Sequence, residues 1–203
     1  LRAMKRDGHD LKRAMEIGLI DYSDKSGNHY DKFRNRVMFP IETPGGRIVG
    51  FGGRILDDED QGPKYLNSKE SKIFSKRRVL YGLPQARPHI RKQDHCMIME
   101  GYTDVMRCHQ AGFETALASL GTAMTKEHVQ TLRKYAREVI LVYDGDEAGQ
   151  RAARRGGEIA MKHGMNPTVV LLPEGEDPAD VIDADPDRFR EHIDHSEPYL
   201  DVL

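Results

Sequence analysis

Three short apolar runs in the second half of the chain constrain its fold more than any other feature. Residues 95–99, 138–143 and 167–172 each have the length of one buried strand and are too short for a buried helix. Segments with helical character lie between these runs or beside them, at residues 104–110, 125–135 and 147–163. Apolar strands that alternate with helices are typical of a parallel sheet covered by helices. The sequence therefore predicts an α/β fold with a mainly parallel sheet after residue 94.

Acidic residues follow each of these three apolar runs. Glu100 follows the first run, Asp144 and Asp146 follow the second, and Asp177 and Asp180 come shortly after the third. Because the active sites of such sheets lie beyond the carboxyl ends of the strands, we expect these carboxylates to gather at one edge. A carboxylate cluster is unstable unless cations neutralise it, and ligand sets made only of oxygen favour Mg²⁺ or Mn²⁺.

Each acidic motif also has a structural explanation when it is taken alone. Asp144-Gly-Asp146 is a common turn, and a single Glu at a strand end carries little information. The two motifs together, 44 residues apart and each at the end of an apolar strand, are a more specific signal. A helix that begins at Glu147 strengthens the functional interpretation.

The first 93 residues differ from the remainder in charge. Residues 1–93 hold 20 Lys and Arg against 12 Asp and Glu, a net of +8, whereas residues 94–203 hold 11 against 21, a net of −10. Basic surfaces attract phosphate backbones, and clustered carboxylates attract divalent cations. The division favours two different partners, although two ordinary solvated surfaces would give the same counts. In the basic part, residues 36–41 and 47–51 are predicted to form a hairpin around a Pro-Gly-Gly turn.

Cysteine content and hydropathy indicate where the chain functions. The two cysteines, Cys96 and Cys108, lack zinc-finger spacing. No apolar run approaches the length of a membrane span, and the charged first residues do not form a signal peptide. We therefore expect a reduced, cytoplasmic protein without a membrane partner. Because the chain begins at Leu1, we also expect a piece of something longer.

Two segments resemble the Toprim signature: Glu100-Gly-Tyr-Thr-Asp104 and Tyr143-Asp-Gly-Asp-Glu-Ala-Gly149. Toprim domains occur in bacterial primases, type IA and type II topoisomerases, some nucleases and recombination mediators. In that family a Glu and two Asp residues serve metal-dependent phosphoryl chemistry. The resemblance implies catalytic and metal-binding roles for Glu100, Asp144 and Asp146, with Mg²⁺ or Mn²⁺ as the cofactor, and a further role at the metal site for Asp104.

Segments on both sides of residue 94 resemble the bacterial, DnaG-type DNA primases in particular. They are Phe33-Arg-Asn-Arg-Val-Met-Phe-Pro-Ile41, Gly50-Phe-Gly-Gly-Arg54, Pro63-Lys-Tyr-Leu-Asn-Ser68 and Ala118-Ser-Leu-Gly-Thr122. The resemblance implies a DNA-dependent RNA polymerase that synthesises short RNA primers on single-stranded DNA during replication. It also implies nucleotide or template contacts, for which Arg and Lys are suited, at the following positions: Arg34, Arg36, Lys64, Lys76 and Tyr102.

One position departs from the primase pattern. Primases show Asp-Pro-Asp after the last Toprim strand, whereas here Asp177-Pro178 is followed by Ala179. Asp177 matches a metal ligand of the family. Asp180, the next acid, either reaches the site from a different angle or leaves one metal position weaker.

The resemblance also divides the chain. It implies a basic, incomplete α+β subdomain at residues 1–93, a catalytic Toprim domain at residues 94–185 and the start of a C-terminal helical element at residues 186–203. The implied partners are single-stranded DNA, ribonucleoside triphosphates, the RNA primer product and a replicative helicase, bound through a domain absent from this chain. Two other hypotheses stay open: a fragment of a Toprim nuclease or topoisomerase, and a catalytically silent nucleic-acid-binding module.

Overall fold

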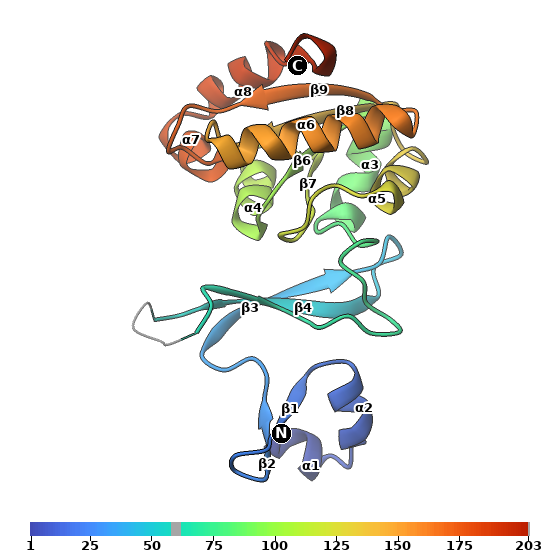
Figure 1. The fold of residues 1–203 in the computed structure, drawn as a ribbon, viewed down its shortest axis with the longest axis vertical. Helices are drawn as coiled ribbons and strands as arrows, with labels where there is room; N and C mark the ends of the chain where they lie inside the picture. Colours follow the sequence, from blue (N-terminus) through green and yellow to red (C-terminus); the bar gives the residue numbers. More distant parts are fainter. Residues whose placement is uncertain (58–61, 203) are drawn as a thin grey trace. The chain divides into compact units, whose positions relative to one another are not determined.

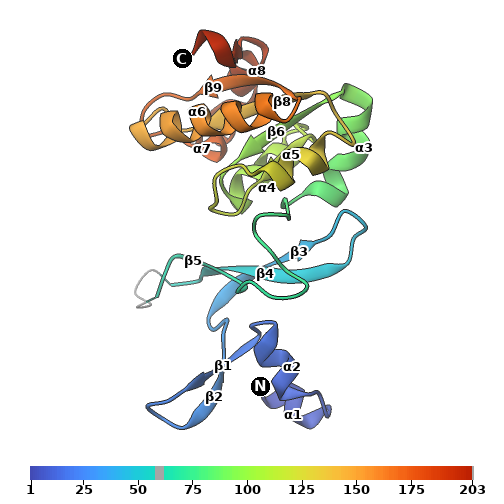
Figure 2. The ribbon, with the colours of Figure 1, turned by 45° about the vertical axis from the view of Figure 1, so that its right-hand side comes forward.

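The computed structural model describes residues 1–57 and 62–202 and divides into two compact units. The N-terminal unit comprises Leu1–Glu42 and Arg47–Ser75, and the sheet unit comprises Thr43–Gly46 and Lys76–Leu203 (Figures 1 and 2). The boundary in the chain thus follows Ser75. The predicted division after residue 93 rested on charge and motifs, and it stays a prediction. Within the described residues no helix combines the length and the apolar character needed to cross a membrane.

The N-terminal unit contains two small antiparallel sheets. In the three-stranded sheet β3 and β4 form the predicted hairpin, and β5 pairs with the other edge of β4. The two-stranded sheet, β1 with β2, was not predicted. Asp10 caps α2 by accepting the N–H groups of Lys12 and Arg13, so that this helix begins at Leu11. The elements are α1 Arg2–Arg6, α2 Leu11–Glu16, β1 Ile20–Ser23, β2 Asn28–Asp31, β3 Arg36–Glu42, β4 Ile48–Ile55 and β5 Tyr65–Asn67.

The sheet unit is built on a five-stranded sheet in the order β10-β9-β8-β6-β7. All neighbouring pairs are parallel except β10 with β9, which confirms the predicted α/β fold with a mainly parallel sheet. Two of the three apolar runs form strands with the predicted bounds, and the third strand begins and ends one residue earlier than predicted. The strands are β6 His95–Met99, β7 Ala116–Ala118, β8 Glu138–Tyr143, β9 Asn166–Leu171 and β10 Glu197–Pro198.

Helices cover both faces of this sheet (Figure 1). Alternate residues of β6 belong to different cores, because successive strand side chains point to opposite faces. Cys96 and Ile98 pack in a core with α3, α5 and α6, whereas Met97 and Met99 pack in a core with α4, α7 and α8. The helices are α3 Leu83–Gln93, α4 Tyr102–Gln110, α5 Lys126–Leu132, α6 Glu147–Lys162, α7 Pro178–Ala184, α8 Pro186–Asp194 and the 3-10 helix Tyr199–Asp201.

The last segment of the chain packs on this unit. Strand β10 pairs with β9, and the Tyr199 side chain is 6% exposed. A Cβ atom on Gly157 of α6 would clash with the Tyr199 ring, so glycine permits this close approach. Residues 186–202 therefore contribute to the core of the sheet unit in addition to adding a helix.

The order of the strands places a topological switch point between β6 and β8. From β6 the chain adds β7 on one side and then crosses over to add β8 on the other. In open α/β sheets, ligands bind beyond the carboxyl ends of the strands at such a point. The residues that follow β6 and β8 therefore occupy the position at which this architecture places a binding site.

Candidate functional site

The predicted carboxylates follow three neighbouring strands of the sheet. Strand β8 lies between β6 and β9, and its Tyr143 pairs with Leu171 of β9. Glu100 comes directly after β6, and Asp144 comes directly after β8. These two residues flank the topological switch point, as the acidic motifs after the apolar strands indicated.

Two glycines hold the Asp-Gly-Asp turn in place. A Cβ atom on Gly145 would clash with the carbonyl oxygen of Leu172, and a Cβ atom on Gly149 would clash with the carbonyl oxygen of Asp144. Only glycine lets these backbones approach so closely. The first contact brings the segment after β9 against the turn, and the second brings the first turn of α6 against it.

Three of the acidic residues also hold helix N-termini. Asp146 Oδ1 accepts the Gly149 N–H at 2.7 Å and caps α6. Asp177 Oδ1 accepts the Asp180 N–H at 2.8 Å and caps α7. Asp104 lies in the first turn of α4, and its Oδ2 accepts the Gly101 N–H at 2.9 Å. Because helix N-termini stabilise negative charge, the caps hold the carboxylates near this edge of the sheet.

The acidic residues act on one another electrostatically. Desolvation raises the pKa of Glu100, and the charges of Asp144 and Asp146 raise it further. Desolvation likewise raises the pKa of Asp144, and Asp177, Asp146 and Asp180 add to the effect. Such mutual effects require carboxylates that lie close together. The structure therefore brings Asp180 into the same electrostatic cluster.

Asp104 is the most buried member of the cluster, with 6% of its surface exposed. Desolvation, followed by the charge of Asp177, raises its pKa to about 6, although the hydrogen bond from Gly101 opposes the rise. Asp144 and Glu100 raise the pKa by smaller amounts. A carboxylate in this position would be stabilised by a nearby cation, because the cation would offset both the burial and the repulsion.

The donor chemistry of the cluster fits a hard divalent cation, because it offers only carboxylate oxygens. In the part of the chain that the structure describes, however, no three His, Cys, Asp or Glu side chains converge into a ready ligand set. Mutual repulsion opposes such convergence when no cation is bound. The residues that could hold a cation are those whose charges act on one another: Glu100, Asp104, Asp144, Asp146, Asp177 and Asp180.

A cleft of about 280 Å³ adjoins the cluster, and Glu100 lies in its wall. Arg151 and Arg155 line the cleft from α6, one helical turn apart. Arg151 also donates to Glu147 at 3.1 Å. Neither arginine was predicted from the sequence, although their spacing of four residues on the helix after Asp-Gly-Asp was a usable signal. The remaining lining residues are Ser119, Gly121, Thr122, Ala123, Tyr143, Ala148 and Ala152.

Three of the predicted basic contacts lie in the N-terminal unit. Arg34 is exposed and lies over the Tyr30 ring, with its guanidinium carbon 5.2 Å from the ring centroid. Arg36 donates to the carbonyl oxygens of Gly53 at 3.1 Å and Pro63 at 2.9 Å, and so ties the segment before β5 to β4. Lys64 is exposed. Roles of these three residues in nucleotide or template binding stay predictions.

The two other predicted contacts lie in the sheet unit. Lys76 is half-buried and begins the long second segment of the unit. Tyr102 is only 3% exposed, and its ring packs edge to face on Tyr81 with centroids 4.8 Å apart. Packing is therefore the role that the Tyr102 contacts support in this structure. A contact between Tyr102 and a template stays a prediction that would require the ring to leave the core.

Comparisons with known proteins match both parts of the chain. Residues 1–87 match the family described as DNA primase catalytic core, N-terminal domain, and residues 97–182 match the Toprim-like family. The DNA primase of Staphylococcus epidermidis is 44% identical over 179 residues, which make up 88% of this chain and 30% of the relative. The chain thus spans less than a third of that relative's length.

Solved structures match over nearly the whole chain. The RNA polymerase domain of Mycobacterium tuberculosis primase DnaG is 34% identical with a TM-score of 0.88, and the match covers 98% of this chain and 67% of that one. A DnaG primase catalytic domain bound to single-stranded DNA is 38% identical with a TM-score of 0.88, and the match covers 97% of this chain and 65% of that one.

Proposed function

Because this chain belongs to the family of bacterial DnaG-type DNA primases, we propose that it forms part of a catalytic core that synthesises short RNA primers on single-stranded DNA. The reaction is nucleotidyl transfer, in which a 3′-hydroxyl attacks the α-phosphate of a ribonucleoside triphosphate and releases pyrophosphate. Cytoplasmic DNA replication is the process in which we place it.

One observation carries this proposal: Glu100 and the Asp144-Gly-Asp146 turn follow neighbouring strands on either side of the topological switch point. A sheet of this kind binds its ligands at that point. Carboxylates there suit Mg²⁺ or Mn²⁺, with Asp104, Asp177 and Asp180 as the further candidates. A bound divalent cation would neutralise charge on the reacting phosphates and lower the pKa of the attacking hydroxyl.

Residues of the chain would also hold the carboxylates in place, bind phosphate and accept a proton. Asp146 and Asp177 are fixed as helix caps, which limits the movement of their carboxylates when a phosphate approaches. Arg151 and Arg155 give the cleft beside Glu100 a positive wall that suits a phosphate group. Glu100 either ligates the cation or accepts the proton of the hydroxyl, since its raised pKa suits a proton acceptor.

We assign binding of nucleotide and template to the basic residues Arg34, Arg36, Lys64 and Lys76 and to Tyr102. Arg and Lys recognise phosphates, and binding that depends on them weakens as salt is raised. The binding partners in this proposal are the single-stranded template, ribonucleoside triphosphates and the RNA product. A replicative helicase would be bound through a region outside this chain.

A single gel tests the proposal. The protein is incubated with end-labelled single-stranded DNA, ribonucleotides of which one carries a different label, and Mg²⁺ or Mn²⁺. Asp146→Ala is run beside wild type, and Asp194→Ala, an exposed acid at the end of α8, is the matched control. We expect short RNA that requires template and metal, is made by the control and is missing with Asp146→Ala.

Other outcomes of the gel contradict the proposal. Shortened DNA without RNA, again lost in Asp146→Ala, would identify a nuclease. Absence of both products, even when the flanking regions found in the longer relatives are restored, would favour a silent binding module.

A further inference from the structure

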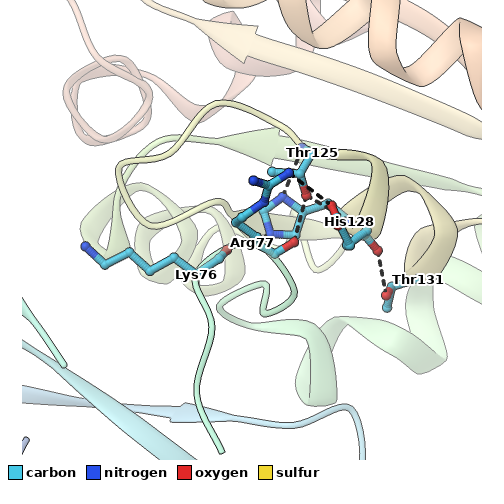
Figure 3. A network of polar contacts seen from close by, with 6 residues as sticks. Lys76, Arg77, Thr125, His128 and Thr131 are labelled. Carbon is cyan, nitrogen blue, oxygen red and sulfur yellow. Dashed lines mark hydrogen bonds and ion pairs between the residues drawn. The ribbon is translucent and has the colours of Figure 1, made fainter. Parts of the chain in front are cut away.

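A buried histidine links helix α5 to the segment that carries Lys76. His128 lies in the first turn of α5 and is 0% exposed. Its Nδ1 lies 3.3 Å from the backbone nitrogen of Thr125, and its Nε2 lies 2.9 Å from the carbonyl oxygen of Lys76. Both ring nitrogens therefore have backbone partners, as Figure 3 shows.

The partners determine which ring nitrogen carries the proton. A carbonyl oxygen only accepts, so Nε2 must donate to Lys76, and a backbone N–H only donates, so Nδ1 must accept from Thr125. The ring is then a neutral imidazole. Burial agrees with this assignment, because it lowers the pKa of His128.

The next carbonyl along the chain is held from the same helix terminus. Thr125 Oγ1 donates to the carbonyl oxygen of Arg77 at 2.7 Å and accepts the N–H of His128 at 3.1 Å (Figure 3). Two successive carbonyl groups, those of Lys76 and Arg77, are thus fixed by two side chains of one capping box. Residues 76 and 77 lie outside every helix and strand, so their carbonyl groups lack the hydrogen bonds of regular secondary structure. The bonds from His128 and Thr125 take the place of those bonds and order the backbone.

The arrangement has a consequence for the Lys76 side chain. In Figure 3 this side chain extends away from the His128 ring. The hydrogen bonds to the backbone therefore fix the Cα atom from which the side chain projects. A lysine side chain has a flexible stem and considerable rotamer entropy. A fixed starting point reduces the volume that the ammonium group samples, and such preorganisation strengthens binding without adding a contact.

We propose that His128 and Thr125 are positioning residues that hold the backbone at residues 76 and 77 so that the Lys76 ammonium group meets a phosphate group of the bound nucleotide or template. The inference rests on the proposed function, in which Lys76 contacts phosphate. It goes beyond that function by assigning a binding role to two residues that touch no ligand.

A double-mutant cycle separates this role from a merely structural one. Dissociation constants are measured for wild type, Lys76→Ala, His128→Leu and the double variant. One arm uses a fluorescent ATP analogue with Mg²⁺, and the other uses a fluorescein-labelled oligo-dT. We expect each single variant to weaken binding about tenfold in the same arm, whereas the double variant binds no more weakly than Lys76→Ala. The affected arm identifies the phosphate as that of the nucleotide or that of the DNA.

Further variants keep the test decisive. His128→Gln, whose amide can donate to Lys76 and accept from Thr125, should restore most of the affinity. Thr125→Val should weaken binding and Thr125→Ser should not, which provides a second route if His128→Leu does not fold. His109→Leu is the matched control, because His109 also contacts a carbonyl, that of Ala116, at 2.9 Å. This control should bind like wild type in both arms.

Two results would overturn the inference alone: wild-type affinity in a folded His128→Leu protein, or a loss of affinity that persists in full when Lys76 is already alanine. If wild type binds neither probe, the proposed function fails, and the role of Lys76 fails with it. The two failures are therefore distinguishable.

Discussion

The carbonyl oxygen of Leu172 lies in the space that a side chain on Gly145 would occupy. This contact joins the segment after β9 to the turn after β8, and each of these segments carries acidic residues of the cluster. The geometry of the cluster therefore depends on glycine at position 145, because any side chain there would clash with Leu172.

Replacing this glycine tests that dependence. Gly145→Ala forces the backbone of the turn away from Leu172, and overpacking of this kind lowers the free energy of unfolding by about 1–3 kcal/mol. Chemical denaturation measures the loss. Gly45→Ala is the control, because the nearest atom to its Cβ would be Thr43 Oγ1 at 3.9 Å. Equal stability of the two variants would contradict the close approach.

Asp104→Asn should make the metal-free protein more stable at pH 7. The amide retains an oxygen that can accept the Gly101 N–H, and it removes a buried charge that repels Asp177. A pKa raised to about 6 corresponds to a gain on the order of 1–3 kcal/mol. Urea denaturation in EDTA measures this gain. If the metal-free variant is less stable than wild type, the favourable interactions of the Asp104 carboxylate outweigh its burial and its repulsion by Asp177, and the prediction is wrong.

The stability of the metal-free protein should also depend on pH through this cluster. The folded-state pKa values of Glu100, Asp104 and Asp144 are raised, so that between about pH 4 and pH 6 the folded state binds more protons than the unfolded state. The contribution of these groups to the free energy of unfolding therefore falls as pH rises through this window. Comparing wild type with Asp104→Asn at pH 4.5 and pH 7 isolates the effect, because the difference between them should grow with pH. A constant difference would contradict it.

Arg155→Ala should weaken binding of phosphate-containing ligands. Arg155 lines the cleft beside Glu100, whereas its neighbour Arg154, which is exposed like Arg155, does not line it. Removing one charged donor to a phosphate should raise the dissociation constant of a labelled oligonucleotide or a nucleotide several-fold. Fluorescence anisotropy with Arg154→Ala as the control distinguishes a cleft contact from a general loss of charge. Equal effects of the two variants would argue against a ligand in the cleft.

Much of the fold follows from local sequence patterns. The bounds of β6 and β8 were predicted because buried parallel strands are continuous apolar runs with polar residues at each end. The hairpin of β1 and β2 was missed because Ile20–Ser23 and Asn28–Asp31 are mostly polar and only partly buried. The full length of helix α3 could not be predicted, because Pro88 lies inside it and proline usually ends or kinks a helix.

Some of the functional residues could be predicted from the sequence, and others could not. Acids directly after parallel strands gather at one edge of the sheet, so the positions of Glu100 and Asp144 followed from the strand assignment. The burial of Tyr102 did not follow, because the Toprim motif does not say which side of α4 faces the core. His128 and Lys76 lie 52 residues apart, and only the tertiary structure shows that they meet.

Mn²⁺ binding, measured as the loss of the EPR signal of free Mn²⁺, tests the carboxylate cluster most directly. Wild type should bind Mn²⁺, Mg²⁺ should compete, and Asp144→Asn with Asp146→Asn should weaken binding at least tenfold, whereas Asp194→Asn should not. If wild type leaves the free Mn²⁺ signal unchanged, or the double variant binds as tightly as wild type, the acidic residues beyond β6, β8 and β9 are not a metal site.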